Sequence, residues 1–471
     1  MAAALAHRDM GTVVRLFRKW TGASQTSVGA VVGMPQPAVS DLEHGGRRIV
    51  TLELFERFAE GLGIPRHLLG LAGKSEASSP KQNGVNYRAM DVDEKTAASH
   101  RRWLAVRRQL GLHRPELTRL ARGLYPPDVQ LGETGMLIAP EWRLPAPIEL
   151  SAVELAWQEQ TPPPTVTGRE AETRPMRPLN SADQRYSTYH RAVRDLDKPR
   201  LFENRLCYRL LGVDRSPDSG ALRLTLRSMC YFDMIDVGEA LAHEIALNTH
   251  DTAGRLRPEY ATWQRLPFRR LLRDPFDLSA YPLMLSVSTL TVRRSKAGST
   301  FYLLRRNPSK VAIAGGMLSV FPTGVFQPAS VLPAPNSPDF DLWRNVMREY
   351  SEEFLGNPEH DGDGPPIDYE NEEPFRSLEA ARAEGRLNVY CLGVGIDALN
   401  YVGDVLTVAI FDADVFDHIF GAMVQQNDEG DVDSEQYALD AGVMARLLAA
   451  QPVAPSGAAC IRLAAGWFVR S

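Results

Sequence analysis

The sequence contains few cysteines and no long hydrophobic run. Its four cysteines lie far apart along 471 residues, which argues against a disulfide framework and against a cysteine-based zinc site. No apolar stretch approaches the roughly 20 residues of a membrane-spanning helix, and the N-terminus lacks a basic start followed by an apolar core. We therefore expect buried thiols, no membrane partner and a protein that stays in the cytoplasm.

Charge is distributed unevenly along the chain. Residues 1–125 contain 19 basic and 11 acidic residues, whereas the remainder contains 34 basic and 47 acidic residues. A hydrophobic content of 44% is that of an ordinary globular protein, and the length predicts several domains. The basic first quarter permits binding to a phosphate backbone.

The domain organisation follows from changes in composition and periodicity. We expect a multidomain chain in which an all-α N-terminal part precedes an α+β C-terminal part. The predicted parts are a helical domain over 1–73, a linker with a basic helix and a Pro-rich connector over 74–180, a middle mixed α/β domain over 181–284, and an α+β domain over 285–471.

Periodicity also predicts individual elements of the larger part. Helices with a basic outer face are expected over 93–123, and further helices around 199–211 and 237–248. Strands are expected in a hairpin from residue 285 to 304 and around 389–392 and 405–411, followed by two C-terminal helices. The acidic, Gly- and Pro-rich run 357–374 predicts a surface loop.

The first 70 residues carry the sharpest signal. One apolar helix face is formed by Val13, Leu16, Phe17 and Trp20. Ser24 can cap a short helix that Gly33 ends, and a second short helix, 36–43, follows after only two residues. Another amphipathic helix is expected over 52–62, and Pro65 can open a fifth. This order of elements predicts a helix-turn-helix.

The string S-Q-T-S-V-G-A-V-V-G-M-P-Q-P-A-V-S-D-L-E-H-G, which begins at residue 24, resembles the Cro and lambda-repressor-like (XRE-type) helix-turn-helix family. The resemblance covers residues 10–70 and implies that the second short helix enters the major groove of double-stranded DNA. The positions that match DNA-contacting residues of the family are Gln25 for phosphate, Gln36, Pro37, Ser40 and Asp41 for base edges, and Arg47 and Arg48 for additional positive charge. The chain departs from the family at Pro37, which cannot hydrogen-bond a base, and at Asp41, which is acidic.

A second motif lies near the C-terminus. In R-E-Y-S-E-E-F-L-G, which begins at Arg348, the residues Glu349, Glu352 and Glu353 lie on one helix, and such carboxylates repel each other unless magnesium or arginine lies between them. This helix resembles that of the Nudix hydrolase family over roughly 285–450, which implies magnesium at the three glutamates. By position, Arg348 and Gly324 match residues that line the family's ligand pocket, with Pro322 in the same loop. Ser330 and Phe340 stand where the family has acidic residues.

These motifs support two functions of different classes. The first is a sequence-specific, homodimeric transcriptional regulator with a degenerate Nudix-like domain that senses a nucleotide-like small molecule. The alternative is a magnesium-dependent Nudix-type hydrolase of a nucleoside diphosphate derivative that carries a DNA-binding domain. An acidic helix surface without a ligand is a third interpretation of the glutamates. The pair His243-Glu244 resembles the start of a zinc motif, but Leu247 occupies the second histidine position, so we interpret it as a buried polar pair.

Overall fold

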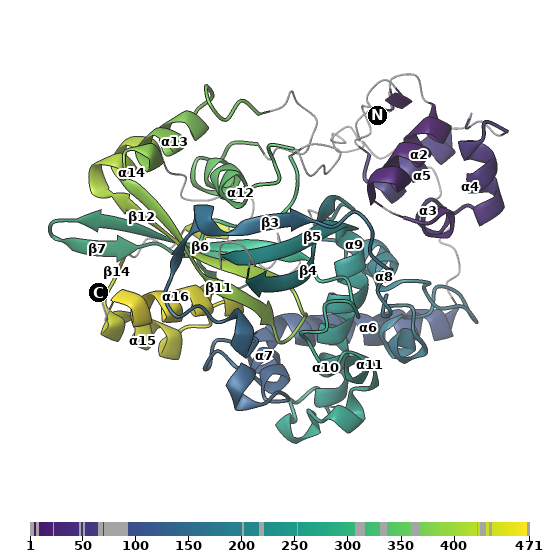
Figure 1. Cartoon of the computed structure of the whole chain (residues 1–471). Helices are drawn as coiled ribbons and strands as arrows, with labels where there is room; N and C mark the ends of the chain where they lie inside the picture. The colour runs from purple at the N-terminus through teal and green to yellow at the C-terminus, as the bar shows by residue number, and fades with distance from the viewer. Residues whose placement is uncertain are drawn as a thin grey trace, which may run out of the picture.

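The computed structural model describes residues 4–5, 9–21, 23–46, 49, 52–64, 69, 93–199, 202–215, 221–251, 253–306, 316–329, 337–358, 367–421, 423, 430–432 and 436–468. Within these ranges a small helical module lies beside a larger body of mixed helix and sheet (Figure 1). The expected order, an all-helical part followed by a mixed part, is therefore confirmed. The first part of the predicted segment 74–180, up to residue 92, and the start of the fifth helix at residue 65 lie outside the described residues.

The helices of the N-terminal module are α2 (Met10–Thr21), α3 (Gln25–Val32), α4 (Gln36–Glu43) and α5 (Leu52–Leu62). Ser24 caps α3, since its hydroxyl accepts a hydrogen bond from the amide of Ser27, and Gly33 ends the helix at a φ of 65°. Val13, Phe17 and the inward residues of α3 to α5 form a separate hydrophobic core. The predicted helices of this part are thus confirmed.

The module lies against one end of the body. Leu206, at the start of β4 (Leu206–Arg215), packs into the core of the module. Gly63 has a φ of 65°, and a Cβ atom there would lie 2.3 Å from the carbonyl oxygen of Asn204. Glycine is therefore required at this position for two reasons, the left-handed backbone and the close approach of the body.

The body is built on an eight-stranded sheet. Its strand order is β1 (Met136–Leu137), β11 (Leu387–Asp397), β12 (Gly403–Asp412), β6 (Leu285–Ser295), β7 (Gly298–Phe301) and β14 (Tyr437–Ala438), with β10 (Thr323–Val325) paired to β6 and β2 (Ile148–Glu149) paired to β11. The β12–β6 pair is parallel and the other pairs are antiparallel. The predicted hairpin after residue 285 and the predicted strands around 389 and 405 are confirmed.

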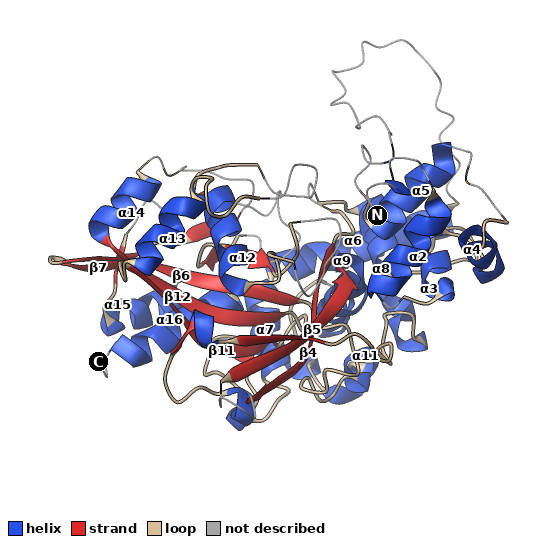
Figure 2. Cartoon of the chain, turned by 45° about the horizontal axis from the view of Figure 1, so that its top comes forward, coloured by secondary structure: helices blue, strands red, loops and turns tan. Residues whose placement is uncertain are grey.

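Helices cover both faces of this sheet (Figures 1 and 2). One face carries α12 (Leu342–Glu349), α13 (Phe375–Ala383) and α14 (Ala413–Phe420), and the other carries α15 (Ala441–Ala450) and α16 (Pro455–Phe468). Two smaller sheets have the strand orders β3 (Glu154–Trp157), β5 (Leu222–Cys230), β4, and β13 (Gly430–Val432), β8 (Leu304–Arg306), β9 (Leu318–Ser319).

A helical layer completes the body. It contains α6 (Glu94–Leu112), α7 (Arg114–Arg122), α8 (Tyr189–Leu196), α9 (Tyr231–Met234), a π-helical turn (Ile235–Glu239), α10 (Ala240–Thr249) and α11 (Pro267–Leu271). One hydrophobic core extends from Trp103 to Ala464, across the expected boundaries at residues 180 and 284. The Pro-rich connector takes part in it because the connector supplies β1, β2 and β3.

Three expectations about the body need correction. The segment around 199–211, expected to be helical, contains the strand β4, because its backbone pairs with β5. The basic face of α6 and α7 is not wholly exposed, since the guanidinium groups of Arg107 and Arg114 bond the buried carboxylate of Glu239. Tyr369, in the expected surface loop, is buried.

Of the helices described, none has the length and apolar character needed to cross a membrane.

Candidate functional site

A tight turn joins α3 to α4. The amide of Met34 donates to the carbonyl of Gly29 over 2.7 Å, and a Cβ atom at Gly29 would lie 2.4 Å from the carbonyl oxygen of Met34. Pro35 then takes the cap position of α4 with an extended backbone. Because these contacts fix the turn, the two short helices are held at one angle to each other.

A buried ion pair supports this turn from inside. The carboxylate of Glu43 has a side-chain exposure of 4% and accepts hydrogen bonds from Arg18 Nη1 at both oxygens, each over 2.7 Å. Burial alone would raise the pKa of Glu43. The hydrogen bonds from Arg18 and Gln25 together outweigh burial, so the pKa lies below its usual value. Glu43 is therefore an ionised acceptor beneath α3 and α4.

This acceptor sets the direction of a hydrogen-bond chain that reaches the surface. Because a carboxylate only accepts, Gln25 turns its amide nitrogen toward Glu43 and accepts at Oε1 from Nε2 of Gln36 over 2.6 Å. Gln36 is itself exposed, and its Oε1 accepts no hydrogen bond within the described residues. The chain Arg18–Glu43–Gln25–Gln36 thus orients the first residue of α4.

The other predicted DNA-contacting residues lie on or beside α4. Pro37 and Asp41 are exposed and Ser40 is half-buried, so they share the outward side of the helix with Gln36. Val39 and Leu42 are buried in the module, as the sequence pattern requires. The structure therefore brings together five of the seven predicted residues, counting Gln25; Arg47 and Arg48 lie outside the described residues.

The C-terminal glutamates lie close to the loop predicted to accompany them. A Cβ atom at Gly324 would lie 1.9 Å from a carboxylate oxygen of Glu349, so the two residues are in direct contact. The backbone amide of Thr323 donates to Oε1 of Glu353 over 2.9 Å, and Glu353 is buried. After Glu349 the helix continues as a π-helical turn (Tyr350–Phe354), which changes the spacing of the glutamates from that of a regular α-helix.

Arg348 occupies a buried polar cluster behind the same helix. Its guanidinium donates to the hydroxyl of Tyr369 over 2.9 Å, to Oδ1 of Asn345 over 2.9 Å and to the carbonyl of Gln327 over 2.6 Å. Asp339 lies 3.5 Å away and accepts a hydrogen bond from Tyr369. These contacts anchor α12 to the segments on either side of it.

The carboxylates of this region make local contacts. Across the described ranges, no group of three or more His, Cys, Asp or Glu side chains is placed to hold a metal ion. Glu353 accepts from the backbone of β10 with one oxygen, and Glu349 packs on Gly324. Magnesium at Glu349, Glu352 and Glu353 stays a prediction from the sequence.

Comparison with known proteins adds one finding. A family model described as a helix-turn-helix domain matches residues 9–71, which include α2 to α5 and the α3–α4 turn. The N-terminal module is a helix-turn-helix domain. No curated protein and no solved structure matches the chain.

The sequence did not predict the ion pair inside the helix-turn-helix domain. A signal was present, because Glu43 follows Leu42 at the end of α4 and lies with Val39 on the inward side, where a charge needs a partner. The partner could not be identified without the structure, since Arg18 is 25 residues away on α2.

The interpretation of His243 and Glu244 as a buried polar pair is confirmed. Nδ1 of His243 lies 3.0 Å from the hydroxyl oxygen of Tyr189, and the Glu244 carboxylate accepts from the amides of Phe268 and Arg269 at the start of α11. Burial raises the pKa of Glu244 to about 7, with these two hydrogen bonds opposing the shift. Both residues therefore have a role in the packing of α10.

Proposed function

We propose that the protein is a sequence-specific transcriptional regulator that binds double-stranded DNA through α4. The observation that carries the proposal is the exposed, oriented side of α4 within a helix-turn-helix domain. In such domains the second short helix enters the major groove and its outward polar side chains contact base edges. Gln36 is the best placed of these side chains, because the buried Arg18–Glu43 pair fixes its orientation through Gln25.

The chemistry of this side of α4 indicates which base edges it would contact. Oε1 of Gln36 and the carboxylate of Asp41 are acceptors, and the hydroxyl of Ser40 both donates and accepts. In the major groove, the amino groups of adenine and cytosine are the donors. The proposed interface therefore prefers adenine or cytosine opposite Gln36 and Asp41.

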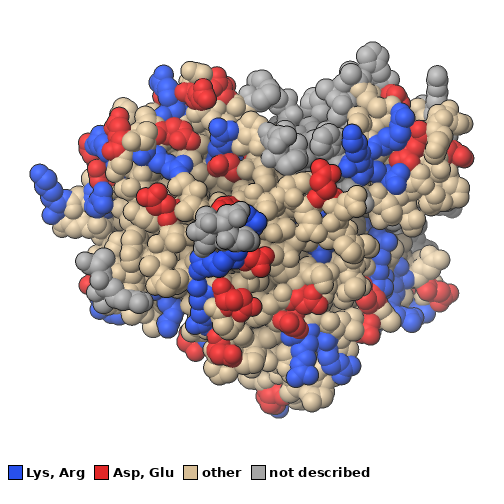
Figure 3. All heavy atoms as spheres, viewed as in Figure 1, with Lys and Arg blue, Asp and Glu red and all other residues tan. Residues whose placement is uncertain are grey.

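Attraction to the phosphates has to come from outside α4. Figure 3 shows Lys and Arg side chains on the helix-turn-helix domain and again on the part of the body that lies next to it, over the region of α8. Because a single such domain makes few base contacts, we further propose that the protein binds as a homodimer to a near-palindromic site.

Binding-site selection from random duplexes with the intact protein, followed by fluorescence anisotropy, tests this proposal. Gln36→Ala and Ser40→Ala should each weaken binding to the selected site by on the order of 1 to 3 kcal/mol and broaden the selected sequence. Gln160→Ala, an exposed glutamine of the body, serves as the matched control and should change neither. Equal loss of affinity on all sequences, or no selection, would refute base recognition by α4.

For the C-terminal region we propose a Nudix-like fold used for sensing a nucleotide-like molecule. The support is the parallel β6–β12 pair between α12 and α16 and the contact of Gly324 with Glu349. The hydrolase alternative is less well supported, because one oxygen of Glu353 already accepts a backbone amide. A melting-temperature increase with ADP-ribose, without product formation, is expected. Turnover that is lost in Glu352→Gln would establish the hydrolase instead.

A further inference from the structure

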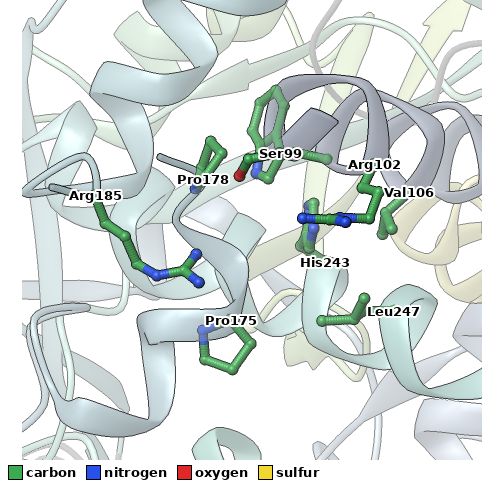
Figure 4. Close-up of a pocket in the computed structure, with 9 residues that line it drawn as sticks. Ser99, Arg102, Val106, Pro175, Pro178, Arg185, His243 and Leu247 are labelled. Atoms are coloured by element: carbon green, nitrogen blue, oxygen red, sulfur yellow. The ribbon is translucent and has the colours of Figure 1, made fainter. Parts of the chain in front are cut away.

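The body contains a pocket that neither sequence motif predicts. Its cavity has a volume of about 270 Å³. We call it the arginine pocket, and its lining residues are Ser99, Arg102, Trp103 and Val106 of α6, Pro175, Pro178 and Arg185 of the connector, and His243 and Leu247 of α10 (Figure 4). Three segments that are distant in the sequence therefore form it.

The walls of the arginine pocket are mostly apolar and are held in place. Nε1 of Trp103 donates to the carbonyl of Met176 over 2.8 Å, and the Trp103 ring stacks on His243 with ring centroids 5.6 Å apart. The hydroxyl of Ser99 accepts a hydrogen bond from the amide of Leu179 over 3.0 Å, which ties the connector to α6. The pocket is thus preformed, as ligand sites usually are.

Two guanidinium groups point into the space between the walls. Figure 4 shows Arg102 and Arg185 extending toward each other across the pocket from α6 and from the connector. Burial, and then the positive charges of Arg174, Arg177 and Arg102, lower the pKa of Arg185. Arg185 donates to the carbonyl oxygen of Arg177 over 2.6 Å, and over the described part of the chain neither Arg102 nor Arg185 forms an ion pair with an Asp or Glu. Both residues are exposed, so two positive charges without an acidic partner lie at the mouth of the pocket.

The floor of the pocket is formed by a neutral histidine. His243 is 1% exposed, and burial followed by the charge of Arg107 holds its pKa well below its usual value. Arg107 donates to the hydroxyl oxygen of Tyr189, and that oxygen lies 3.0 Å from Nδ1 of His243. His243 therefore adds no charge to the pocket.

We propose that the arginine pocket binds a small organic carboxylate with an apolar ring or branched body. The planar guanidinium groups of Arg102 and Arg185 match a carboxylate in geometry and charge, and the aromatic, proline and leucine walls match an apolar body. The volume of about 270 Å³ lies slightly below the roughly 300 to 1,000 Å³ of typical ligand pockets, which favours a small ligand. This site is separate from the Nudix-like region.

The test uses the intact protein with benzoate, phenylacetate and isovalerate as probes, and benzamide and phenylacetamide as neutral counterparts. At least one carboxylate should raise the melting temperature and bind in calorimetry, whereas the amides should not. Arg102→Ala and Arg185→Ala should each weaken carboxylate binding by about tenfold or more, since each removes a charge-assisted hydrogen bond. Arg108→Ala, an exposed arginine of the same helix outside the pocket, is the control and should bind like the wild type.

Failure of every carboxylate to bind, or equal binding of the neutral amides, overturns the proposal. If instead the Arg102 and Arg185 variants lose affinity for DNA in the absence of carboxylate, these arginines contact phosphate and the proposal is also wrong. Because the binding measurement contains no DNA, a protein that binds carboxylate but never DNA would refute the proposed function and leave the pocket assignment standing.

Discussion

The buried Arg18–Glu43 pair gives the sharpest prediction about the helix-turn-helix domain. In Glu43→Ala, Arg18 and Gln25 lose the acceptor to which both donate. Removing one member of a buried pair costs about 3 to 5 kcal/mol, because the other charge is left without its partner. The side chain of Arg18 is 30% exposed, so water can solvate part of its charge, and we expect about 2 kcal/mol instead.

Hydrogen exchange of the intact protein, followed by mass spectrometry, measures this loss locally. A decrease of about 2 kcal/mol in the opening free energy corresponds to roughly 30-fold faster exchange in peptides from α3 and α4. Exchange in α10 and α16 should stay unchanged, since they belong to the separate core of the body. The affinity of Glu43→Ala for DNA should also fall, because the orientation of Gln36 is no longer fixed.

The matched control is Glu94→Gln on α6. Glu94 pairs with Arg101, but its side chain is 82% exposed, and exposed pairs of this kind contribute about 0 to 1 kcal/mol. The control should leave exchange in α3 and α4 unchanged. If Glu43→Ala also leaves it unchanged, the ion pair does not hold the turn and the reasoning about Gln25 and Gln36 fails.

Two further predictions concern the body. Gly324→Ala should destabilise the protein by about 1 to 2 kcal/mol in denaturant titration, because the added Cβ would displace the Glu349 carboxylate. The control Gly111→Ala, in open space on α6, should be neutral or stabilising. Equal effects of the two substitutions would contradict the contact between Gly324 and Glu349. Burial raises the pKa of Asp404 to about 7, and a hydrogen bond from Ser288 opposes this shift. The protonated carboxyl group of Asp404 therefore stabilises the fold fully below about pH 4, and this contribution is lost as the pH rises toward 7. Asp404→Asn should remove this slope and be more stable than the wild type at pH 8 by on the order of 3 kcal/mol, and an unchanged slope in urea unfolding would refute it.

Much of the helix-turn-helix domain could be predicted because its signals are local. Ser24, Gly33 and Pro35 fix helix ends through capping and backbone preference, so the bounds of α3 and α4 follow from nearby residues. The strands β6, β7, β11 and β12 were also predictable, because alternating apolar residues are typical of strands, whereas the short strands β9, β10, β13 and β14 were not predicted.

The failures occurred where distant parts of the chain decide the structure. Leu206 and Leu210 fit either a helix or a strand by spacing, and pairing of β4 with β5 settles the outcome. The hydrogen bond from the amide of Thr323 to Oε1 of Glu353 joins residues 30 positions apart, so the sequence could not predict it. The arginine pocket could not be predicted, since Arg102, Arg185 and His243 meet only after the chain has folded.

Hydroxyl-radical footprinting of the intact protein on its selected duplex tests the DNA-binding claim most directly. Two α4 helices of a dimer should protect two half-sites about 34 Å apart, centred on successive major grooves, and Gln36→Ala should lose this pattern before it loses weak, salt-sensitive binding. Uniform protection of any duplex, or none at low salt, would contradict the claim that α4 reads a DNA sequence.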